Sequence, residues 1–496
     1  MSRLSNARDY ISKNKDKVNE EYRLKYHVMP EIGWINDPNG FIYYNGEYHL
    51  FFQYYPYDSQ WGPMHWGHVK SSDLIKWRHL PVALAPDMYY DAGGCFSGTA
   101  IEKDGKLYLM YTGNTNPDLE KPENIRQLQN IALSEDGIEF EKISANPVIQ
   151  TKDLPTNALP QDFRDPKILK NGDYFYCLVG SRNPDESGQL LVYKSKNISE
   201  WSYVGTLLKS ENKLGKMWEC PDLFKVEETD VIIMSPQFLE RDGDKYCNVH
   251  SSIYLLGKCD IEKCSFNTSV IDEIDGGFDF YAPQTLVDEK GRRIMIAWMQ
   301  MWDMNMPSNE KGHGWAGAMT LPRELKINNN KLYQLPVEEI KEYRVNNVEY
   351  KEVAVKKSLT LDKVEGQNIE LELEIDALKS NIFGIKVLKD EEHETVMYYQ
   401  KDQGKFIFDR SKNGQDISAA GIEDDIKYVR KVAVNLIDNK LKLRIFIDRT
   451  SVEIFIQDGE RVITSTVYPK ATAKSVEFFS DDEVIINKLD KWDIEL

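Results

Sequence analysis

A repeat of about sixty residues is the sequence feature that most constrains how this chain can fold. Short apolar strands and tight turns recur up to about residue 335. The turns lie at Asn45-Gly46, Asp104-Gly105, Asn171-Gly172, Thr229-Asp230 and Lys290-Gly291. Their second residues are 59, 67, 58 and 61 positions apart. A fixed period of this length indicates a solenoid, a propeller or an array of similar units.

A second pattern has nearly the same period. Asp73, Asp136 and Asn197 each precede an aromatic residue by four positions, and Asp260 continues this series of polar positions at intervals of 63, 61 and 63 residues. The strands are rich in Tyr, Phe, Ile and Val, and Asn-Gly and Asp-Gly turns favour tight hairpins. Four-stranded sheets repeated around an axis expose only short edges. The sequence therefore predicts a five-bladed β-propeller over residues 25–335.

The rest of the chain is expected to form three smaller parts. Residues 1–24 are charged and helix-permissive, which predicts a short N-terminal helical extension. Residues 336–345 fit a linker helix. Residues 346–496 contain segments that alternate polar with apolar side chains, as half-buried antiparallel strands do, and so favour a C-terminal β-sandwich. The predicted fold class is all-β, and the sandwich is expected to pack on the propeller, to contribute to a dimer or to form one wall of a cleft.

Composition limits the possible partners. The 496 residues have a formal net charge of −18, which disfavours binding to nucleic acid and to anionic membranes. No apolar run reaches the roughly 18 residues of a membrane span. The start of the chain lacks the layout of a secretion signal, and the six cysteines form no C-x-x-C pair. We therefore expect a cytoplasmic protein, either a monomer or a homodimer, without a metal or cofactor.

Carboxylates recur at corresponding places just before the turns. The corresponding segments are Asn36-Asp37-Pro38-Asn39-Gly40, Gly94-Cys95-Phe96-Ser97-Gly98, Arg164-Asp165-Pro166, Glu219-Cys220-Pro221-Asp222 and Tyr281-Ala282-Pro283-Gln284. Taken alone, Asp37-Pro38-Asn39-Gly40 is typical of a type I turn, Arg164-Asp165-Pro166 of a salt bridge before a bend, and Glu219 of a solvated loop. Corresponding positions in a closed ring face a common axis, so Asp37, Asp165 and Glu219 are expected to converge. Like charges are costly to bury together, and chains keep such clusters mostly for function.

The surroundings of the first acid suggest a sugar pocket. Trp34, Trp61 and Trp66 lie near Asp37 in the sequence, with polar side chains between them. Most of these aromatic residues are expected in the blade core, but such a composition also suits a sugar, whose apolar ring faces stack and whose hydroxyls need fixed partners. Acids in an aromatic cleft without metal signals point to glycoside hydrolysis.

Four of these motifs, in this order, closely resemble the signatures of glycoside hydrolase family 32. They are Trp34-Ile35-Asn36-Asp37-Pro38-Asn39-Gly40, Phe96-Ser97-Gly98, Arg164-Asp165-Pro166 and Trp218-Glu219-Cys220-Pro221-Asp222. The likeness continues into Asp448-Arg449-Thr450-Ser451-Val452-Glu453-Ile454-Phe455 and so covers nearly the whole chain. The family comprises invertases, sucrose-6-phosphate hydrolases and fructan hydrolases. Thr99 stands where many members have Ser.

The resemblance implies a role for each acid. Asp37 corresponds to the nucleophile, Glu219 to the acid/base, and Asp165 to the residue that stabilises the transition state. Positions that line the fructose subsite in relatives correspond to Asn36, Gln53, Trp61, Phe96, Ser97 and Trp315. Arg164 is expected either to orient Asp165 or to contact the substrate. Trp315 also fits a close-packed strand.

These roles predict the protonation of the site. Glu219 must hold a proton to protonate the leaving oxygen, and burial near other carboxylates is expected to raise its pKa. Asp165 is expected to stay ionised, because sugar hydroxyls and Arg164 favour its anion. A retaining mechanism places the carboxyl groups of Asp37 and Glu219 roughly 5 to 6 Å apart.

The predicted activity is that of a retaining β-fructofuranosidase acting on a small sugar, either sucrose or sucrose 6-phosphate. Exo-acting hydrolysis of fructan or fructo-oligosaccharide is the nearest alternative. A phosphate would need a local cation, for which Arg126, Lys311 and His313 are weak candidates. An inverting propeller glycosidase acting on arabinan or xylan, a carbohydrate-binding propeller without turnover and a structural scaffold also remain open.

Overall fold

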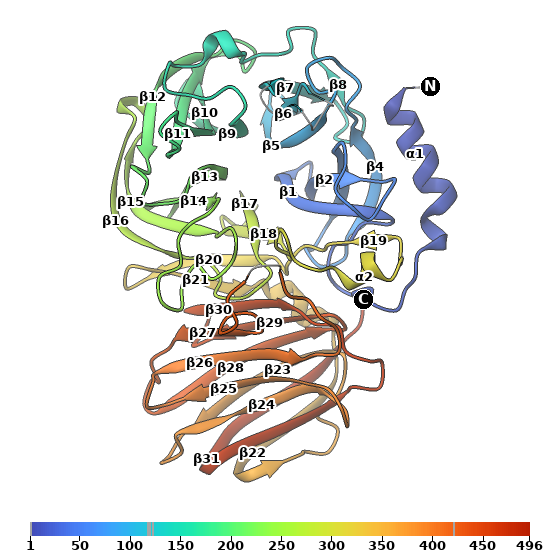
Figure 1. The fold of residues 1–496 in the computed structure, drawn as a ribbon, viewed down its shortest axis with the longest axis vertical. Coiled ribbons are helices and arrows are strands. Elements are labelled where there is room, and N and C mark those ends of the chain that lie inside the picture. Colours follow the sequence, from blue (N-terminus) through green and yellow to red (C-terminus); the bar gives the residue numbers. More distant parts are fainter. Residues whose placement is uncertain (1, 117–120, 122–123, 420–421) are drawn as a thin grey trace.

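The structure is a computed structural model that describes residues 2–116, 121, 124–419 and 422–496. Two β domains are stacked along the long axis of the molecule, the N-terminal one above the C-terminal one in Figure 1. The N-terminal helix α1 (Arg3–Asn14) lies on the outside of the upper domain. None of the helices in the described part of the chain is long and apolar enough to cross a membrane.

The described residues of the upper domain form five blades of antiparallel strands, and the predicted five-bladed propeller is confirmed. Blade I contains β1 (Gly33–Tyr44), β2 (Glu47–Tyr55), β3 (His65–Ser71) and β4 (Arg78–Leu84). Blade II contains β5 (Gly94–Lys103), β6 (Lys106–Asn114), β7 (Gln127–Ser134) and β8 (Glu141–Lys142). Blade III contains β9 (Phe163–Asn171), β10 (Tyr174–Arg182), β11 (Gly188–Ser195) and β12 (Ser202–Lys209). Blade IV contains β13 (Trp218–Val226), β14 (Thr229–Pro236), β15 (Ile253–Asp260) and β16 (Ser265–Glu273), and blade V contains β17 (Tyr281–Val287), β18 (Arg293–Trp298), β20 (Arg323–Asn328) and β21 (Lys331–Pro336).

Apolar side chains between neighbouring blades hold the ring together. Blade V meets blade I through Ile294 and Ile296, which pack with Ile35 and Leu50 in one buried cluster. The short strand β19 (Trp315–Ala316), from the connection between β18 and β20, pairs in parallel with the start of β1. The ring is thus closed both by core packing and by main-chain pairing. Figure 1 shows β1, β5, β9, β13 and β17 nearest the centre of the ring.

The innermost strand of each blade has a β-bulge near its start. The pairing register shifts between Ile35 and Pro38 in β1, and between Phe96 and Gly98 in β5. The corresponding shifts in β9, β13 and β17 follow Arg164, Glu219 and Tyr281. A bulge inserts an extra residue and re-aims the neighbouring side chains. The bulges therefore turn the start of each inner strand toward the axis.

The second repeat pattern marks the turn between the third and fourth strands of the blades. The Oδ1 atom of Asp136 accepts hydrogen bonds from the backbone N–H groups of Ile138 at 2.8 Å and Glu139 at 3.0 Å. Asp73 and Asn197 accept the same kind of bonds in blades I and III. A short polar side chain that satisfies backbone donors is the usual signature of such turns, which explains why this position recurs at the blade period.

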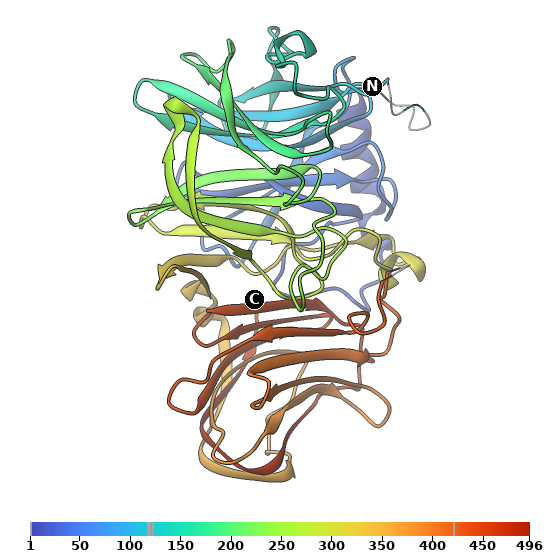
Figure 2. The same cartoon turned by 60° about the vertical axis from the view of Figure 1, so that its left-hand side comes forward.

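The lower domain is a sandwich-like sheet of ten described strands, as predicted. Its strands are β22 (Arg344–Leu359), β23 (Asn368–Asp376), β24 (Ile382–Lys389), β25 (Glu394–Gln400), β26 (Lys405–Lys412), β27 (Val429–Ala433), β28 (Lys440–Asp448), β29 (Ser451–Ile456), β30 (Arg461–Thr466) and β31 (Ser475–Ile494). The long strand β31 pairs with β24 through its first half and with β23 through its second half. It therefore passes from one layer to the other around a common apolar core. Figure 2 shows the curved layers from the side.

Short helical segments complete the chain. They are η1 (Lys15–Lys17), η3 (Thr151–Asp153), η4 (Ile261–Lys263), α2 (Pro307–Glu310) and η5 (Glu338–Tyr343), and η5 connects the two domains. Helix α1 covers the outer strand of blade I: the Arg8 Nη2 group donates to the Val82 carbonyl oxygen at 2.8 Å. Ala7 on the same helix is fully buried in the blade core. Covering an edge strand in this way blocks edge-to-edge pairing.

Buried charges join the two domains. The ring of His27, which precedes blade I, lies between Asp448 and Glu453 of the sandwich, with Nδ1 and Nε2 at 2.8 and 2.9 Å from their carboxylate oxygens. Glu453 also pairs with the buried Arg323 of blade V at 2.5 Å. Arg323 in turn contacts Asp275, in the loop after blade IV, at 3.0 Å. These buried carboxylates and cations pair across the interface between the domains, so the network fixes the sandwich on the propeller.

Candidate active site

The three predicted acids meet near the propeller axis. Asp37, Asp165 and Glu219 lie on the inner strands β1, β9 and β13, at or beside the bulges. Cys220 links the two aspartates: its Sγ atom is 3.5 Å from Asp37 Oδ2 and 3.6 Å from Asp165 Oδ2. Its backbone N–H also donates to Asp165 Oδ2 at 3.0 Å. Residues that are far apart in the sequence thus meet in one cluster.

Two neighbouring blades hold the Glu219 carboxylate. Arg164 donates to Glu219 Oε1 through Nε at 3.0 Å and Nη2 at 2.8 Å. The Tyr281 hydroxyl donates to the other oxygen, Oε2, at 2.5 Å. Asp162 orients the arginine by accepting from Nη1 at 3.0 Å. Both carboxylate oxygens of Glu219 therefore have fixed partners, one from blade III and one from blade V.

The Asp37 carboxylate is fixed by its own blade and by blade II. Ser97 Oγ donates to Asp37 Oδ2 at 2.7 Å, and Asn36 Nδ2 donates to Oδ1 at 3.1 Å. The Trp34 indole N–H in turn donates to Asn36 Oδ1 at 2.8 Å. These bonds fix the rotamer of Asp37 and hold its carboxylate in one orientation.

The acids do not all occupy the same position of the repeat. By strand pairing, Arg164, Glu219 and Tyr281 are equivalent, because each is the last paired residue before its bulge. Asp165 and Cys220 follow at the first bulge position, with φ of 63° and 46°. Left-handed backbone costs a non-glycine residue of order 1–3 kcal/mol and is concentrated at functional sites. Glu219 therefore stands one residue earlier in its blade than Asp165 does in its own.

Charge and burial set the protonation of the sugar-free site. Burial raises the pKa of Asp37, although the Ser97 hydrogen bond opposes the shift. Burial also raises the pKa of Asp165 to about 7, against the opposing charge of Arg164. Burial alone would raise the pKa of Glu219 as well, but Arg164, His250 and the Tyr281 hydrogen bond outweigh it, and the pKa is lowered.

The predicted rise of the Glu219 pKa is therefore wrong for the sugar-free site, whereas the predicted ionisation of Asp165, which relied on sugar hydroxyls, stays a prediction for the sugar-bound site. The physical reason is the direction of the Arg164 side chain. Its guanidinium donates to Glu219 and to Asp162, so it stabilises the Glu219 anion directly. Asp165 instead accepts hydrogen bonds from the backbone N–H and the thiol of Cys220. These bonds stabilise its anion less than a guanidinium would, so the effect of burial on its pKa prevails.

Four other predicted residues have clear positions. Gln53 is buried on β2 and donates through Nε2 to the Cys95 carbonyl oxygen at 3.0 Å. Trp61 and Phe96 meet edge to face with ring centroids 6.1 Å apart, beside a cluster that contains Trp34 and Cys220. Trp315 lies in another cluster, with Tyr22 and Tyr468, and its indole N–H donates to the Asn19 carbonyl oxygen at 3.0 Å.

The candidate phosphate ligands already have partners. Lys311 Nζ contacts the Tyr22 hydroxyl at 3.0 Å, and His313 Nε2 is 3.7 Å from a Glu21 carboxylate oxygen. The Arg126 guanidinium donates to the Ile125 carbonyl oxygen at 2.7 Å. Lys311 and His313 thus belong to the surroundings of the Tyr22 cluster that also contains Trp315.

Sequence reasoning gave no role to several groups at the site. Tyr281 and Cys220 lie inside the motifs, and the repeat position of Tyr281 could have indicated its approach to Glu219. His250 and Trp302 lie in irregular connections without any repeat signal. The His250 ring is 5.8 Å from the Tyr281 ring, and the Trp302 ring stacks on Trp34 at 6.0 Å.

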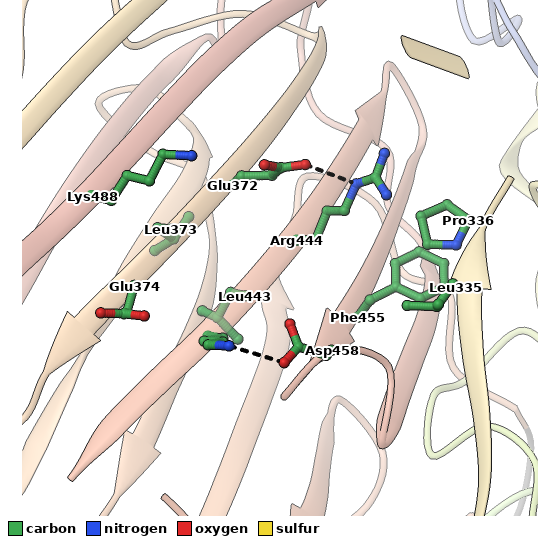
Figure 3. Close-up of a pocket in the computed structure, with 11 residues that line it drawn as sticks. Leu335, Pro336, Glu372, Leu373, Glu374, Leu443, Arg444, Phe455, Asp458 and Lys488 are labelled. Carbon is green, nitrogen blue, oxygen red and sulfur yellow. Dashed lines mark hydrogen bonds and ion pairs between the residues drawn. The ribbon is translucent and has the colours of Figure 1, made fainter. Parts of the chain in front are cut away.

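A separate hollow of about 290 Å³ lies between β21 and the sandwich, away from the acids. Two ion pairs lie in its lining, Lys442 with Asp458 at 3.0 Å and Arg444 with Glu372 at 3.4 Å, and Figure 3 shows the second of them. None of Asp37, Asp165 and Glu219 lines it. The cluster of Asp37, Asp165 and Glu219 near the propeller axis is therefore the candidate active site.

A five-bladed propeller with buried carboxylates at its axis, joined to a β-sandwich, is an arrangement that suits glycoside hydrolysis. The family model described as the glycosyl hydrolases family 32 N-terminal domain matches residues 27–336, and the family 32 C-terminal model matches residues 339–493. The chain belongs to glycoside hydrolase family 32, as the motifs predict.

Individual relatives agree over nearly the full length. The sucrose-6-phosphate hydrolase of Zymomonas mobilis is 38% identical over 97% of this chain and 94% of that protein. The structure of sucrose-6-phosphate hydrolase from Lactobacillus gasseri is similar with a TM-score of 0.85 and 30% identity, covering 99% of this chain and 96% of that one. The GH32 β-fructofuranosidase of Bombyx mori, solved as a variant with sucrose, has a TM-score of 0.84 and 34% identity, covering 99% and 98%.

Proposed function

We propose that this protein is a retaining β-fructofuranosidase that hydrolyses sucrose or sucrose 6-phosphate. The observation that carries the proposal is the meeting of three acids from three blades, with Cys220 touching both aspartates and Glu219 held between Arg164 and Tyr281. The similar proteins named above are sucrose-6-phosphate hydrolases and a β-fructofuranosidase solved with sucrose. These similarities support the proposal that the chain cleaves the same glycosidic bond in the same small substrates.

Asp37 is proposed as the nucleophile. Its hydrogen bonds from Ser97 and Asn36 orient the carboxylate, so that an oxygen can attack C2 of the fructosyl unit. The attack forms a covalent fructosyl-enzyme, which water then hydrolyses with overall retention. Asp165 is proposed to bind fructose hydroxyls and to stabilise the positive charge that develops at C2 and the ring oxygen.

Glu219 is proposed as the acid/base, and it must gain its proton when the substrate binds. In the sugar-free site the pKa of Glu219 is lowered and that of Asp165 is about 7, so Asp165 is the better proton holder. Fructose hydroxyls that donate to Asp165 would favour its anion. A leaving oxygen placed against Glu219 would favour its acid form. We infer that binding moves the proton toward Glu219, which then protonates the leaving oxygen.

A cytoplasmic location is part of the same proposal. All six cysteines are described and are free thiols, and Cys95, Cys177 and Cys220 are buried. Free thiols persist in reducing compartments. A small sugar imported into the cell suits such a location.

Glucose release from sucrose tests the proposal. Wild-type protein is expected to release glucose and fructose, and Asp37→Ala is expected to lose activity by at least about 10⁴-fold, since removal of a nucleophile leaves only binding and charge stabilisation. A melting curve like that of the wild type would show that the variant is folded. If the wild type turns over none of sucrose, sucrose 6-phosphate and a short fructan, the proposal is refuted.

A further inference from the structure

A second set of polar side chains lies on the inner strands of blades III, IV and V. Lys167 on β9, Asp222 on β13 and Gln284 on β17 are each the first paired residue after the bulge of their strand. Each of them comes three positions after the last paired residue before that bulge. Because the earlier positions hold Glu219 and its two partners, this second set lies one step further along the same strands.

An ion pair and three hydrogen bonds join blades III, IV and V at this level. Lys167 Nζ lies 2.9 Å from Asp222 Oδ2 and donates to the Thr285 carbonyl oxygen at 3.2 Å. Asp222 Oδ2 also accepts from the Thr285 backbone N–H at 3.0 Å and from the Thr285 hydroxyl at 2.8 Å. Lys167, Asp222 and Thr285 therefore form one connected group, which we call the axial tie.

The axial tie reaches across the propeller axis. In the ring, β13 of blade IV lies between β9 of blade III and β17 of blade V, yet Lys167 bonds directly to Thr285. That bond must therefore pass on the axis side of β13. Gln284 makes a second crossing, because its Nε2 group donates from blade V to the Gly98 carbonyl oxygen of blade II at 2.8 Å. The axial tie thus lies at the hub, where one side chain can fix the spacing of several blades.

The ion pair of the axial tie is buried. The side chains of Lys167 and Asp222 are 13% and 1% exposed. A buried ion pair adds little net stability, because the desolvation of both charges offsets their attraction. What the pair does provide is a fixed distance between the two strands that carry the charges.

The proposed chemistry changes the bonds of Glu219 but not those of the axial tie. In the sugar-free site Arg164 and Tyr281 hold the Glu219 carboxylate between blades III and V. As the acid/base, Glu219 must turn an oxygen to the leaving group and exchange its proton twice, so its bonds to these partners change with its charge. The axial tie joins the same three blades and has no assigned step in the reaction. It therefore holds the start of β13 in place while the bonds of Glu219 change.

We propose that Lys167 and Asp222 are positioning residues for proton delivery, whose ion pair at the axis fixes β13, and with it Glu219, against the neighbouring inner strands. The proposal rests on the proposed function and deepens it. Displacement of a catalytic group by about 1 Å can cost about 100-fold in rate. The axial tie thus acts on the reaction through the place of Glu219 and not through contact with the sugar.

The test compares a substrate that needs the acid with one that does not. Sucrose has a poor leaving group that must be protonated, whereas p-nitrophenyl β-D-fructofuranoside has a good leaving group that departs largely without a proton. Lys167→Met is expected to lower kcat about 50-fold on sucrose and less than about five-fold on the nitrophenyl substrate, with both KM values within about three-fold of the wild type. A loss of folded protein alone would lower both rates by the same factor.

A second variant separates positioning from folding. Lys167→Met leaves the Asp222 charge buried without its partner and is expected to be destabilised. In the double variant Lys167→Met/Asp222→Asn neither charge remains, and the asparagine amide oxygen can still accept from Thr285. The midpoint of thermal unfolding is expected to return toward that of the wild type, while the selective loss of activity on sucrose persists. If the single variant does not fold, the double variant decides.

Lys142→Met is the matched control. Lys142 pairs with Asp91 at 2.6 Å, and these side chains are 12% and 0% exposed, nearly as in the axial tie. Lys142 lies on the outermost strand β8 of blade II, and Asp91 lies in the connection between blades I and II. The control is expected to lose stability and to change both rates by the same factor.

Each outcome has one meaning. Equal losses on the two substrates in the folded Lys167 variants overturn the positioning role, and so does a double variant that recovers kcat on sucrose together with its unfolding midpoint. A selective loss of the same size in Lys142→Met also overturns it. In each of these cases sucrose hydrolysis by the wild type upholds the proposed function. If the wild type releases fructose from neither substrate, the proposed function itself fails.

Discussion

Arg164, Glu219 and Tyr281 occupy the same position in three consecutive blades, and this shared position explains how Glu219 is held. The last paired residue before each bulge points toward the axis, so its equivalents in adjacent blades reach one another. An arginine and a tyrosine at these positions leave Glu219 with a charged donor on one oxygen and a hydroxyl on the other. Hydrogen bonds to a charged group are worth about 1.5–3 kcal/mol each.

The Tyr281→Phe variant removes one hydroxyl and so tests the hydrogen bond from Tyr281 to Glu219. Because the Tyr281 hydrogen bond lowers the pKa of Glu219, its loss is expected to raise that pKa. The first step needs the acid form, so the alkaline limb of the kcat profile is expected to move to higher pH, and kcat is expected to fall about ten-fold. The measurement is initial-rate kinetics on sucrose between about pH 4 and 9.

Tyr193→Phe provides the control for that experiment. Tyr193, on blade III, is also buried, but its hydroxyl donates to the Asp153 carbonyl oxygen at 3.2 Å. Its loss is expected to leave the pH profile unchanged. An unshifted profile in Tyr281→Phe, with the same fall in kcat, would show that Tyr281 only supports the fold.

At the level of elements, the bulge in the innermost strand of a blade is what places functional side chains at the propeller axis. Each blade needs its third and fourth strands for edge protection and packing, whereas the start of the inner strand is released from regular pairing by the bulge. The partner strand must also let the next blade approach closely. Gly180 on β10 does so, because a Cβ atom there would lie 2.0 Å from the Trp218 carbonyl oxygen, directly before Glu219.

The Gly180→Ala variant is therefore expected to be damaged in both stability and activity. Overpacking at this point should cost about 1–3 kcal/mol and displace the start of β13 with Glu219. The measurements are the midpoint of thermal unfolding and kcat on sucrose. Gly172→Asn is the control: this glycine lies in a turn with open space around it, at a φ of 59° that asparagine tolerates. Equal behaviour of the two variants would contradict the close approach at Gly180.

Sequence patterns predicted the elements better than they predicted the directions of side chains. The turns and the capping residues Asp136 and Asn197 recur because backbone geometry demands them, so the propeller was predictable. The pKa values of Glu219 and Asp165 were not, because they depend on where the long Arg164 side chain points. His250 and Trp302, which pack beside the acids, lie in irregular connections, where no period links a residue to the axis.

At the level of the whole molecule, the two domains are joined by charges that are buried on both sides. His27 lies between Asp448 and Glu453, and these hydrogen bonds raise its pKa to about 9 against the opposing effect of burial. A histidine whose pKa is raised on folding stabilises the folded state most at pH values below its unfolded pKa of about 6.5. That contribution, about 3 kcal/mol, is lost as the pH rises through about 9.

The midpoint of thermal unfolding is therefore expected to fall between pH 7 and pH 10 in the wild type. The His27→Gln variant is expected to be less stable at pH 7 and to lose most of this pH dependence, because the glutamine cannot carry the proton. His393→Gln is the control, since His393 pairs with Asp390 of the same sandwich domain. An equal alkaline loss in wild type and His27→Gln would contradict a charged His27 at the interface.

The central claim is that the propeller gathers Asp37, Asp165 and Glu219 into a double-displacement site. Proton NMR of the first-formed fructose, recorded before mutarotation, tests it most directly with sucrose as substrate. We predict that β-fructofuranose forms first, with the configuration of the cleaved bond, and that its appearance is abolished in Asp37→Ala. Initial formation of the α-anomer would contradict the account, because inversion requires a single displacement by water.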